Sequence, residues 1–329
     1  MLQNEGYEVV GVYMKLHSTS DEYHQKNIAN VAKVAEYLGI KYEVIDFQKE
    51  FKTNVYDYFV DSYAKGITPN PCVVCNRTIK FGALLEYAKS LGIEKIATGH
   101  YVKTDGNYIY KADDDSKDQS YFLAQIDKEV LPHILFPLGT HKKEDIKKAA
   151  LELGPLKEIA LGKESSEICF VDGTYIEILE RHMDVDIPGD VVDNDGNTIG
   201  SHKGYLHYTI GKRKGFDVPL AHDPHYITKI DPQNNRIVAG KKEELEVNEF
   251  EVRDINMFES LTSFECEVKV RYRSYGIRAH VELGESNGIV KLNEPAYGVA
   301  SGQYAVFYDE QRLIGSGVII SSSIINSVK

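Results

Sequence analysis

The stretch Thr68-Pro69-Asn70-Pro71-Cys72-Val73-Val74-Cys75-Asn76 holds two of the four cysteines in the chain and precedes an apolar pattern of helical period. Each proline disfavours helix at the residue before it, and Asn70 and Asn76 suit turns and helix entries. The stretch therefore predicts a stiff loop that leads into a helix, with Cys75 near the helix N-terminus. At such a position the helix dipole lowers the pKa of a thiol.

Strands and helices are predicted to alternate on both sides of this loop. Apolar runs predict strands over residues 7–13, 42–47 and 95–100, and apolar stripes predict helices over 28–38, 79–91 and 142–153. Gly39 follows the first of these helices as a C-terminal stop. This order indicates a doubly wound α/β domain with its site at the carboxyl ends of the strands, where Gly99 and His100 lie.

Beyond about residue 100 the chain has a different pattern. Asp105-Gly106 and Asp195-Gly196 are hairpin signals. Composition changes near Gly173, where a short helix is predicted, and from about Tyr226 onward short alternating strands are punctuated by glycine. These strands indicate a small barrel or sandwich. Their alternation, continued through Arg273, predicts that Arg271 and Arg273 share one exposed face.

Composition limits the functional classes. The chain has 329 residues, 42% of them hydrophobic, with a formal net charge of −12. It contains no apolar run of membrane-spanning length and no secretory signal, and four cysteines are too few for a disulfide scaffold. We therefore expect a cytoplasmic protein with no membrane partner. The negative charge alone argues against nucleic acid, but two basic segments, 202–215 and 269–273, leave a local binding surface open.

The Cys72-x-x-Cys75 pair has several interpretations. A structural zinc site needs further paired ligands, and Cys169 and Cys266 are single, so no metal is expected. A thioredoxin-like redox pair follows a strand directly, without two prolines, and buried structural thiols are a third interpretation. The fourth is a mechanism in which Cys75 and Cys169 are two low-pKa thiols that meet over one substrate, which suits sulfur transfer through a persulfide and then a disulfide. Residue type and spacing leave these alternatives open.

A resemblance favours the fourth interpretation. The string TPNPCVVCNRTIKF, preceded by GVYMKLH and followed by ATGHY, resembles the tRNA-specific 2-thiouridylase family. The match continues in order through KDQSYFL, FPLG, SSEICFV, HYTIGKRKG, VRYRS and GVASGQ, so it spans nearly the whole chain.

The resemblance implies a fold in three parts. These are an α/β domain of the adenine-nucleotide α-hydrolase-like (PP-loop, Rossmann-like) class over residues 1–172 with both catalytic cysteines, a small central tRNA-contacting domain over 173–228, and a C-terminal β-barrel over 229–329.

The resemblance also implies an enzyme, a tRNA-uridine 2-sulfurtransferase that replaces the 2-oxygen of the wobble uridine in tRNAs for Lys, Glu and Gln. ATP with Mg²⁺ would adenylate the base as a cosubstrate, and sulfur would arrive as a persulfide. Cys169 would carry the persulfide, Cys75 would be the nucleophile, and a Cys75–Cys169 disulfide would follow. A cysteine desulfurase and sulfur-relay proteins would be the partners besides tRNA.

Other site residues carry over by motif. Met14 and Gly99 resemble nucleotide contacts, and Asn70, Pro71 and Cys72 occupy the motif of the target-base pocket. The remaining positions resemble contacts to tRNA: His100, Lys117, Asp118, Gln119, Arg271, Tyr272 and Gln303.

The sequence departs from the family at two places. The family begins with a Ser-Gly-Gly-Val-Asp-Ser-Ser loop that cradles the ATP phosphates, and this string is absent from the printed sequence. We interpret the PP-loop domain as N-terminally truncated, by a truncated or wrongly started reading frame. Cys72 stands where the family has Asp, and we favour the interpretation that the Asp is not essential over a role for Cys72 as a third thiol.

The missing phosphate loop also motivates a rival hypothesis. Under it, the chain is a tRNA-binding or sulfur-carrying module without adenylation activity.

Overall fold

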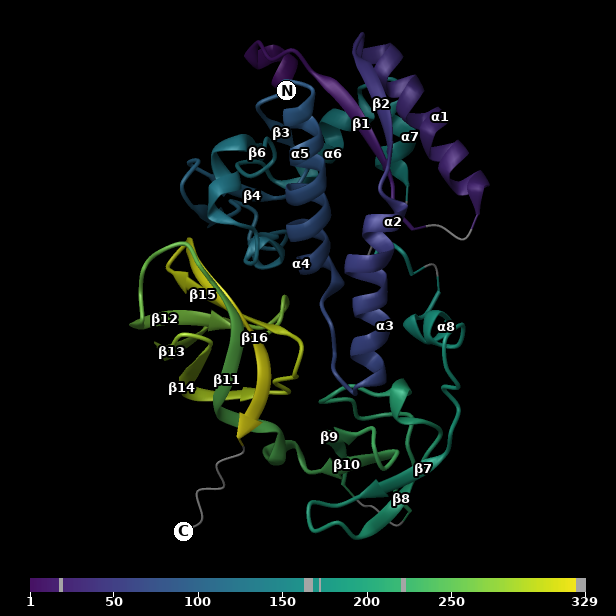
Figure 1. Ribbon diagram of the computed structural model, residues 1–329, viewed down its shortest axis with the longest axis vertical. Helices are drawn as coiled ribbons and strands as arrows, with labels where there is room; N and C mark the ends of the chain where they lie inside the picture. Colours follow the sequence, from purple (N-terminus) through teal and green to yellow (C-terminus); the bar gives the residue numbers. More distant parts are fainter. Residues whose placement is uncertain (18–19, 163–167, 172, 220–222, 324–329) are drawn as a thin grey trace. The chain divides into compact units, whose positions relative to one another are not determined.

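The computed structural model describes residues 1–329 except for 18–19, 163–167, 172, 220–222 and 324–329 (Figure 1). The chain forms two compact units. Unit 1 consists of Met1–Asp57 and Cys72–Asp172, and unit 2 consists of Tyr58–Pro71 and Gly173–Lys329. The polypeptide therefore passes from unit 1 to unit 2 and back before Cys72, so the quoted cysteine stretch spans a unit boundary.

Unit 1 has the predicted α/β pattern. Its elements are η1 (Leu2–Glu5), β1 (Val10–Lys15), α1 (Asp21–Leu38), β2 (Lys41–Asp46), α2 (Gln48–Phe51), η2 (Lys52–Tyr56), η3 (Asn76–Ala83), α5 (Leu84–Ser90), β3 (Ile96–Ala97), β4 (Val102–Thr104), β5 (Ile109–Lys111), η4 (Ser120–Leu123), η5 (Lys128–His133), β6 (Ile134–Leu135), α6 (Lys143–Leu151) and α7 (Leu156–Leu161). Two helices, α3 (Asp57–Ala64) and α4 (Pro71–Cys75), cross between the units.

The first strand, helix and second strand form a parallel crossover unit, as predicted. β1 pairs with β2 in register from Val10↔Lys41 to Lys15↔Asp46. Between them, the side chain of Ser20 accepts a hydrogen bond at the start of α1, and Gly39 ends α1 in the left-handed conformation at φ 64°. The helix stop that Gly39 predicted is confirmed.

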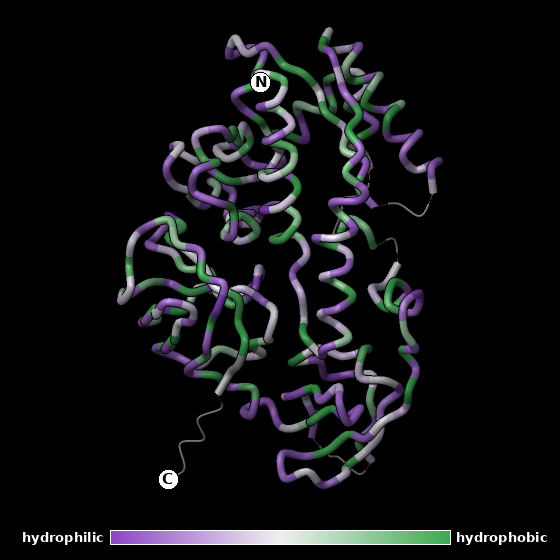
Figure 2. Tube along the Cα trace, in the orientation of Figure 1, coloured by the Kyte–Doolittle hydropathy of each residue, from purple (hydrophilic) through white to green (hydrophobic). Residues whose placement is uncertain are grey.

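The parallel sheet is less continuous than the sequence predicts. β3 contains only Ile96 and Ala97, and it pairs in parallel with β6 rather than joining β1 and β2. Figure 2 shows β1 as largely hydrophobic, yet Val12 on β1 is 42% exposed and Val44 on β2 is 40% exposed. Within the described residues, the predicted single sheet is therefore two separate parallel pairs.

Two long helical runs in the first third of the chain contain π-helical segments. Gln48–Ala64 runs through α2, η2 and α3, and Pro71–Ser90 runs through α4, η3 and α5; η2 and η3 are π-helices. In an α-helix, residues four apart lie above one another, whereas i→i+5 hydrogen bonds align residues that are five apart. Gly82 makes η3 sterically possible, because a Cβ there would lie 2.9 Å from the Arg77 carbonyl oxygen, five residues earlier.

Unit 2 contains a four-stranded sheet in the order β8-β7-β10-β9. Its elements are α8 (Tyr175–Leu179), β7 (Gly189–Val192), β8 (Thr198–His202), η6 (Tyr205–His207), β9 (Tyr226–Asp231) and β10 (Arg236–Gly240). The predicted hairpin at Asp195-Gly196 connects β7 to β8. Because β9 pairs with β10, we propose that the central domain runs through Gly240 rather than ending at 228.

The C-terminal part of unit 2 is a closed barrel, and the prediction of a barrel is confirmed. The strand order β11-β14-β13-β12-β15-β16 returns to β11 through a β11–β16 pairing, so each barrel strand has a neighbour on both sides. Its elements are η7 (Lys242–Leu245), β11 (Glu246–Met257), β12 (Ser263–Lys269), β13 (Ile277–Leu283), β14 (Asn287–Tyr297), β15 (Tyr304–Asp309) and β16 (Arg312–Ser323). The interior of the barrel is filled by apolar side chains, mostly of valine and alanine, together with Phe250 and Phe307.

The close contact at Gly82 gives a stability prediction. We expect Gly82→Ala to lower the free energy of unfolding by about 1–3 kcal/mol, because the added methyl group meets a backbone carbonyl that cannot move aside without breaking the π-helix. Urea unfolding measures the change. Gly11→Ala is the matched control, since a Cβ at Gly11 has only ordinary contacts of 3.5 Å or more. Equal stabilities of the two variants would contradict the steric role of Gly82.

Candidate active site

The paired cysteines lie on the helical run Pro71–Ser90. Pro71 occupies the first turn of α4, where its missing N–H costs nothing, and Cys75 is the last residue of α4. Cys75 is 5% exposed, and Cys72 is half-buried. Cys75 does follow the two prolines into a helix, as predicted, but the helical run begins at Pro71, eight residues before the predicted range 79–91. Cys75 therefore ends the first helical segment rather than lying at the helix N-terminus.

Cys169 belongs to the same unit and has a more open setting. It follows the stretch 163–167, which lies outside the described residues and includes Ser165, Ser166 and Glu167 of the SSEICFV motif, and Cys169 is exposed as a residue. All four cysteines of the chain are free thiols. Besides the larger effect of burial, ionised Cys169 raises the pKa of both Cys72 and Cys75, so unit 1 brings these three thiols into one electrostatic environment.

The predicted lowering of the thiol pKa is wrong. Burial raises the pKa of Cys75 to about 12 and that of Cys72 to about 11, and burial also raises the pKa of Cys169. The physical reason is that desolvation penalises the thiolate, and Cys75 lies inside the protein rather than at an open helix end. In the protein without substrate the three thiols are therefore protonated at neutral pH.

Lys80 is the cation of this environment, and the sequence reasoning missed it. Against the larger effect of burial, it lowers the pKa of Cys72, Cys75 and Cys169. Lys80 follows Cys75 by five residues within η3, so the π-helical bonding places the two residues on one face of the run. In an α-helix, residues five apart point to different faces. The spacing of Cys75 and Lys80 along the chain therefore does not predict that the two residues are neighbours.

His100 is close enough to Lys80 for the lysine charge to affect its pKa. Its Nδ1 lies 2.8 Å from the Thr98 hydroxyl oxygen, and its ring packs against Phe81 and Phe136. Burial, followed by the charge of Lys80, lowers the pKa of His100 to about 3. His100 is therefore neutral at physiological pH and can exchange hydrogen bonds with a ligand but cannot neutralise a phosphate.

The predicted nucleotide contacts lie at the carboxyl ends of parallel strands. Met14 is the fifth residue of β1, and Gly99 follows β3 and is exposed. A Cβ at Gly99 would meet nothing closer than Leu138 at 3.7 Å, so the backbone there is open to a ligand. In α/β sheets this edge is where nucleotides bind.

The loop with Lys117, Asp118 and Gln119 is held from inside unit 1. Asp118 is 6% exposed, and its carboxylate accepts hydrogen bonds from the Ala112 and Ser120 amides and the Ser120 hydroxyl. Gln119 accepts a hydrogen bond from the amide of Tyr101 through its side-chain oxygen. These two side chains shape the loop, and the predicted contact of the loop to tRNA stays a prediction.

In unit 2, Gln303 holds the segment that leads to the target-base motif. Its amide nitrogen donates to the carbonyl oxygens of Thr68 at 3.0 Å and Pro69 at 3.3 Å. The Thr68 amide also donates to the Ser301 carbonyl. Within unit 2 the residues before Asn70 and Pro71 are thus fixed to the barrel loop by backbone and side-chain bonds.

The predicted strand through Arg273 is wrong. β12 ends at Lys269, and a turn follows in which the Ser274 amide donates to the Arg271 carbonyl. Arg271 also donates to the Tyr297 carbonyl, so this guanidinium is held in place on the barrel surface. Tyr272 is half-buried in the same turn, and Tyr275 is 91% exposed. Tyr275 is a second residue that the sequence reasoning missed, and its open ring suits base stacking.

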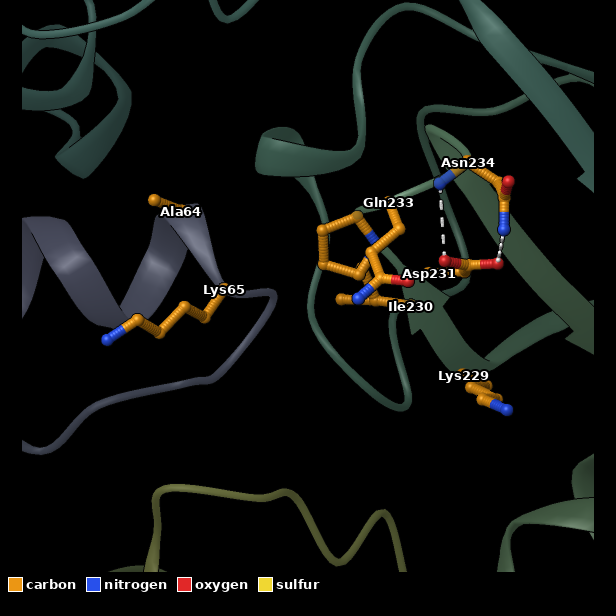
Figure 3. A pocket seen from close by; sticks show the side chains of 8 residues that line it. Ala64, Lys65, Lys229, Ile230, Asp231, Gln233 and Asn234 are labelled. Carbon is orange, nitrogen blue, oxygen red and sulfur yellow. Dashed lines mark hydrogen bonds between the residues drawn. The ribbon is translucent and has the colours of Figure 1, made fainter.

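A hollow of about 490 Å³ in unit 2 holds none of the site residues named above. It is lined by Ala64, Lys65, Lys229, Ile230, Asp231, Pro232, Gln233 and Asn234. Figure 3 shows the ammonium groups of Lys65 and Lys229 extending away from one another, and Asp231 is occupied by two hydrogen bonds from Asn234. The hollow therefore presents no converging charges.

The described part of the chain meets the requirements neither of a clustered metal site nor of a helical membrane span. There, no group of three or more His, Cys, Asp or Glu side chains is arranged to hold a metal ion. None of the described helices is long and apolar enough to cross a membrane.

The three parts of the chain match three family models. Residues 1–173 match the tRNA methyl transferase HUP domain, 176–241 the tRNA methyl transferase PRC-barrel domain, and 247–319 the aminomethyltransferase beta-barrel domain. The fold is therefore an adenine-nucleotide α-hydrolase-like domain followed by a small central domain and a β-barrel, as predicted.

Curated relatives are similar over nearly their whole length. The chain is 56% identical to a tRNA-specific 2-thiouridylase of Nitratiruptor sp., covering 97% of this chain and 94% of the relative. It is 53% identical to one from Aliarcobacter butzleri (98% and 94%) and 54% identical to one from Campylobacter jejuni (97% and 94%). The chain belongs to the tRNA-specific 2-thiouridylase family.

The raised thiol pKa predicts the pH dependence of Cys75 alkylation. At pH 8 we expect iodoacetamide to modify Cys75 roughly 50-fold more slowly than an ordinary thiol, because the smaller thiolate fraction outweighs the greater nucleophilicity of each thiolate. The rate should rise about tenfold per pH unit from pH 8 to pH 10, since the pKa of about 12 lies above this range. Peptide mass spectrometry gives the rate at each cysteine, with urea-unfolded protein as control. A plateau near pH 9 in the folded protein would contradict the assigned burial.

Lys80 gives a second prediction. The Lys80→Met substitution removes the cation that lowers the pKa of the three thiols. Alkylation of Cys169 at pH 8 should therefore slow about three- to tenfold. Lys80→Arg should retain most of the rate. Lys89→Met is the matched control, because Lys89 lies on the following helix and pairs only with Glu86 among the ion pairs described. Equal effects at Lys80 and Lys89 would exclude the assigned role.

Proposed function

We propose that the chain is an ATP-dependent tRNA-uridine 2-sulfurtransferase that thiolates the wobble uridine of tRNAs for Lys, Glu and Gln. The observation that carries the proposal is the group of Cys72, Cys75 and Cys169 with Lys80 in unit 1. Membership of the 2-thiouridylase family supports the substrate and the direction of sulfur transfer.

The exposures of the two catalytic thiols suit different tasks. Cys169 is exposed and can receive a sulfur atom from a donor protein, such as a relay protein charged by a cysteine desulfurase. Cys75 is buried, so a donor protein cannot reach it, and its reaction is restricted to groups brought into the site. This asymmetry supports Cys169 as the persulfide carrier and Cys75 as the second thiol.

The proposed reaction begins with activation of the base and ends with a disulfide. ATP transfers AMP to O2 of the uracil and releases pyrophosphate. The terminal sulfur of the Cys169 persulfide bonds to C2, and AMP leaves with the former O2 oxygen. The Cys75 thiolate then attacks the inner sulfur of Cys169 and breaks the S–S bond, which leaves 2-thiouridine and a Cys75–Cys169 disulfide. A thiol reductant supplies two electrons to restore both thiols.

The surrounding residues have proposed tasks in these steps. Lys80 favours the thiolate of Cys75 against the effect of burial. Neutral His100 offers a hydrogen bond near the thiols without adding a second positive charge. Met14 and Gly99 would contact the nucleotide at the open strand ends, and Mg²⁺ would arrive with the ATP phosphates.

Residues of unit 2 have proposed roles in binding tRNA. Arg271 and the exposed ring of Tyr275 suit phosphate and base contacts. Asn70 and Pro71 are proposed for the target-base pocket, to which Gln303 contributes by fixing the preceding segment.

Cysteine variants test the proposal. With tRNA, ATP and a persulfide donor, Cys75→Ser and Cys169→Ser should give no detectable 2-thiouridine, because each removes one sulfur of the S–S bond that must form and break. Cys72→Ala should retain product at a reduced rate, since Cys72 is not a partner in that bond. Cys266→Ala is the control, because this thiol is buried in the barrel core. Nucleoside mass spectrometry measures the product.

The assay is run on the printed chain and on a version preceded by a strand and the Ser-Gly-Gly-Val-Asp-Ser-Ser loop of the family. AMP release measures adenylation separately from sulfur transfer. Absence of 2-thiouridine from both proteins would contradict the proposed function, as would full activity of Cys75→Ser.

A further inference from the structure

Cys169 has a neighbour with the opposite environment. Cys169 is exposed, whereas Phe170 is 9% exposed. The backbone at Cys169 is therefore held by the adjacent side chain of Phe170, which packs into the interior of unit 1. The function described so far assigns nothing to Phe170 or to the aromatic residues that receive it.

Phe170 enters a cage of three rings. Its ring centroid lies 5.4 Å from that of Phe51, 5.9 Å from that of Tyr56 and 6.2 Å from that of His17. The contacts to Phe51 and His17 are edge-to-face, with interplanar angles of 79° and 82°, the geometry that aromatic quadrupoles favour. His17 in turn stacks on Tyr56 with ring centroids 4.5 Å apart.

Two of the three walls of the cage belong to one helical run, and the third follows a strand. His17 follows β1, while Phe51 ends α2 and Tyr56 ends η2. Phe51 is 1% exposed and Tyr56 is 4% exposed. These two residues are five apart, and the i→i+5 bond from the Asp57 amide to the Lys52 carbonyl closes the π-turn between them. The π-turn thus places both rings on one face of the helical run, where an α-helical period would separate them.

We propose that Phe170 is a positioning residue, an aromatic anchor that fixes Cys169 where its thiol can meet Cys75. This proposal rests on the proposed sulfur transfer between the two cysteines. The anchor leaves the thiol of Cys169 open to a sulfur donor while the adjacent ring limits the movement of its backbone. Under this proposal the transfer requires an aromatic ring at position 170, and an apolar side chain without a ring does not replace it.

The test is the rate at which Cys75 and Cys169 form a disulfide in the full chain without tRNA or ATP. Diamide oxidises the two thiols to one disulfide and is itself reduced to the hydrazine. The Cys72→Ala background removes the competing thiol, and non-reducing peptide mapping identifies the bond. Phe170→Met retains an apolar side chain of similar reach but no ring, and Tyr56→Leu removes a wall of the cage from the other side.

We expect both variants to form the disulfide at least tenfold more slowly than the parent, and Tyr56→Phe, which keeps the ring, to retain the parent rate. The rate of Cys169 alkylation should not fall in any variant, because the thiol stays exposed. Phe250→Leu is the control for general destabilisation, since Phe250 is fully buried in the barrel. It should lower the free energy of unfolding without changing the disulfide rate.

Disulfide rates of Phe170→Met and Tyr56→Leu within twofold of the parent would overturn the anchor. An equal slowing in Phe250→Leu would also overturn it, by showing that the rate follows stability. Either outcome contradicts only the anchor, and the proposed function still holds if the protein makes 2-thiouridine. Conversely, absence of 2-thiouridine from both the printed chain and the version with the phosphate loop contradicts the proposed function, while the disulfide rates of the variants still decide the anchor.

Discussion

The i→i+5 backbone hydrogen bonds of the two π-helical segments are the constraint on which the site depends. Each adds one residue to a helical turn, and each thereby places two residues five apart on the same face. In the run through η3 these residues are Cys75 and Lys80, and in the run through η2 they are Phe51 and Tyr56. The first pair brings a cation to a buried thiol, and the second forms the wall against which Phe170 packs. Such segments are less favourable than α-helix, and they are often found at functional sites.

Burial and charge act in opposition at the thiols. Desolvation keeps them protonated, which protects the unoccupied protein from oxidation and alkylation, because thiolates are the reactive form. Lys80 opposes this effect by lowering the pKa of Cys75, which suits the thiolate that the proposed reaction requires. Cys75, the proposed nucleophile, is therefore less reactive at rest than a helix N-terminal cysteine would be, and the exposed position of Cys169 suits its proposed role of receiving sulfur. The low pKa of His100 keeps its ring uncharged at neutral pH. A second cation beside Lys80 would be costly in a desolvated setting.

Local signals predicted the features that depend on neighbouring residues. Gly39 marked a helix end, Asp195-Gly196 marked a hairpin, and period-two alternation marked the barrel strands. Predictions failed where distant parts of the chain decide the outcome. The pKa of Cys75 depends on burial within its unit. The strand predicted over 95–100 has only the two residues that pair with β6, and the alternation predicted through Arg273 is interrupted by a turn. The π-helices left no periodic signal, because a helical stripe with one extra residue resembles an ordinary amphipathic helix, so Lys80 and the cage around Phe170 could not be predicted from the sequence.

The central claim is that sulfur passes from Cys169 to the substrate while Cys75 takes its place on Cys169. The most direct measurement is a single turnover with persulfide-loaded protein, tRNA and ATP in the absence of reductant, in the version of the chain that carries the phosphate loop. The account predicts one Cys75–Cys169 disulfide for each 2-thiouridine formed, with both appearing at the same rate. Formation of 2-thiouridine while Cys75 stays a free thiol, or with a disulfide that contains Cys72 in its place, would contradict it.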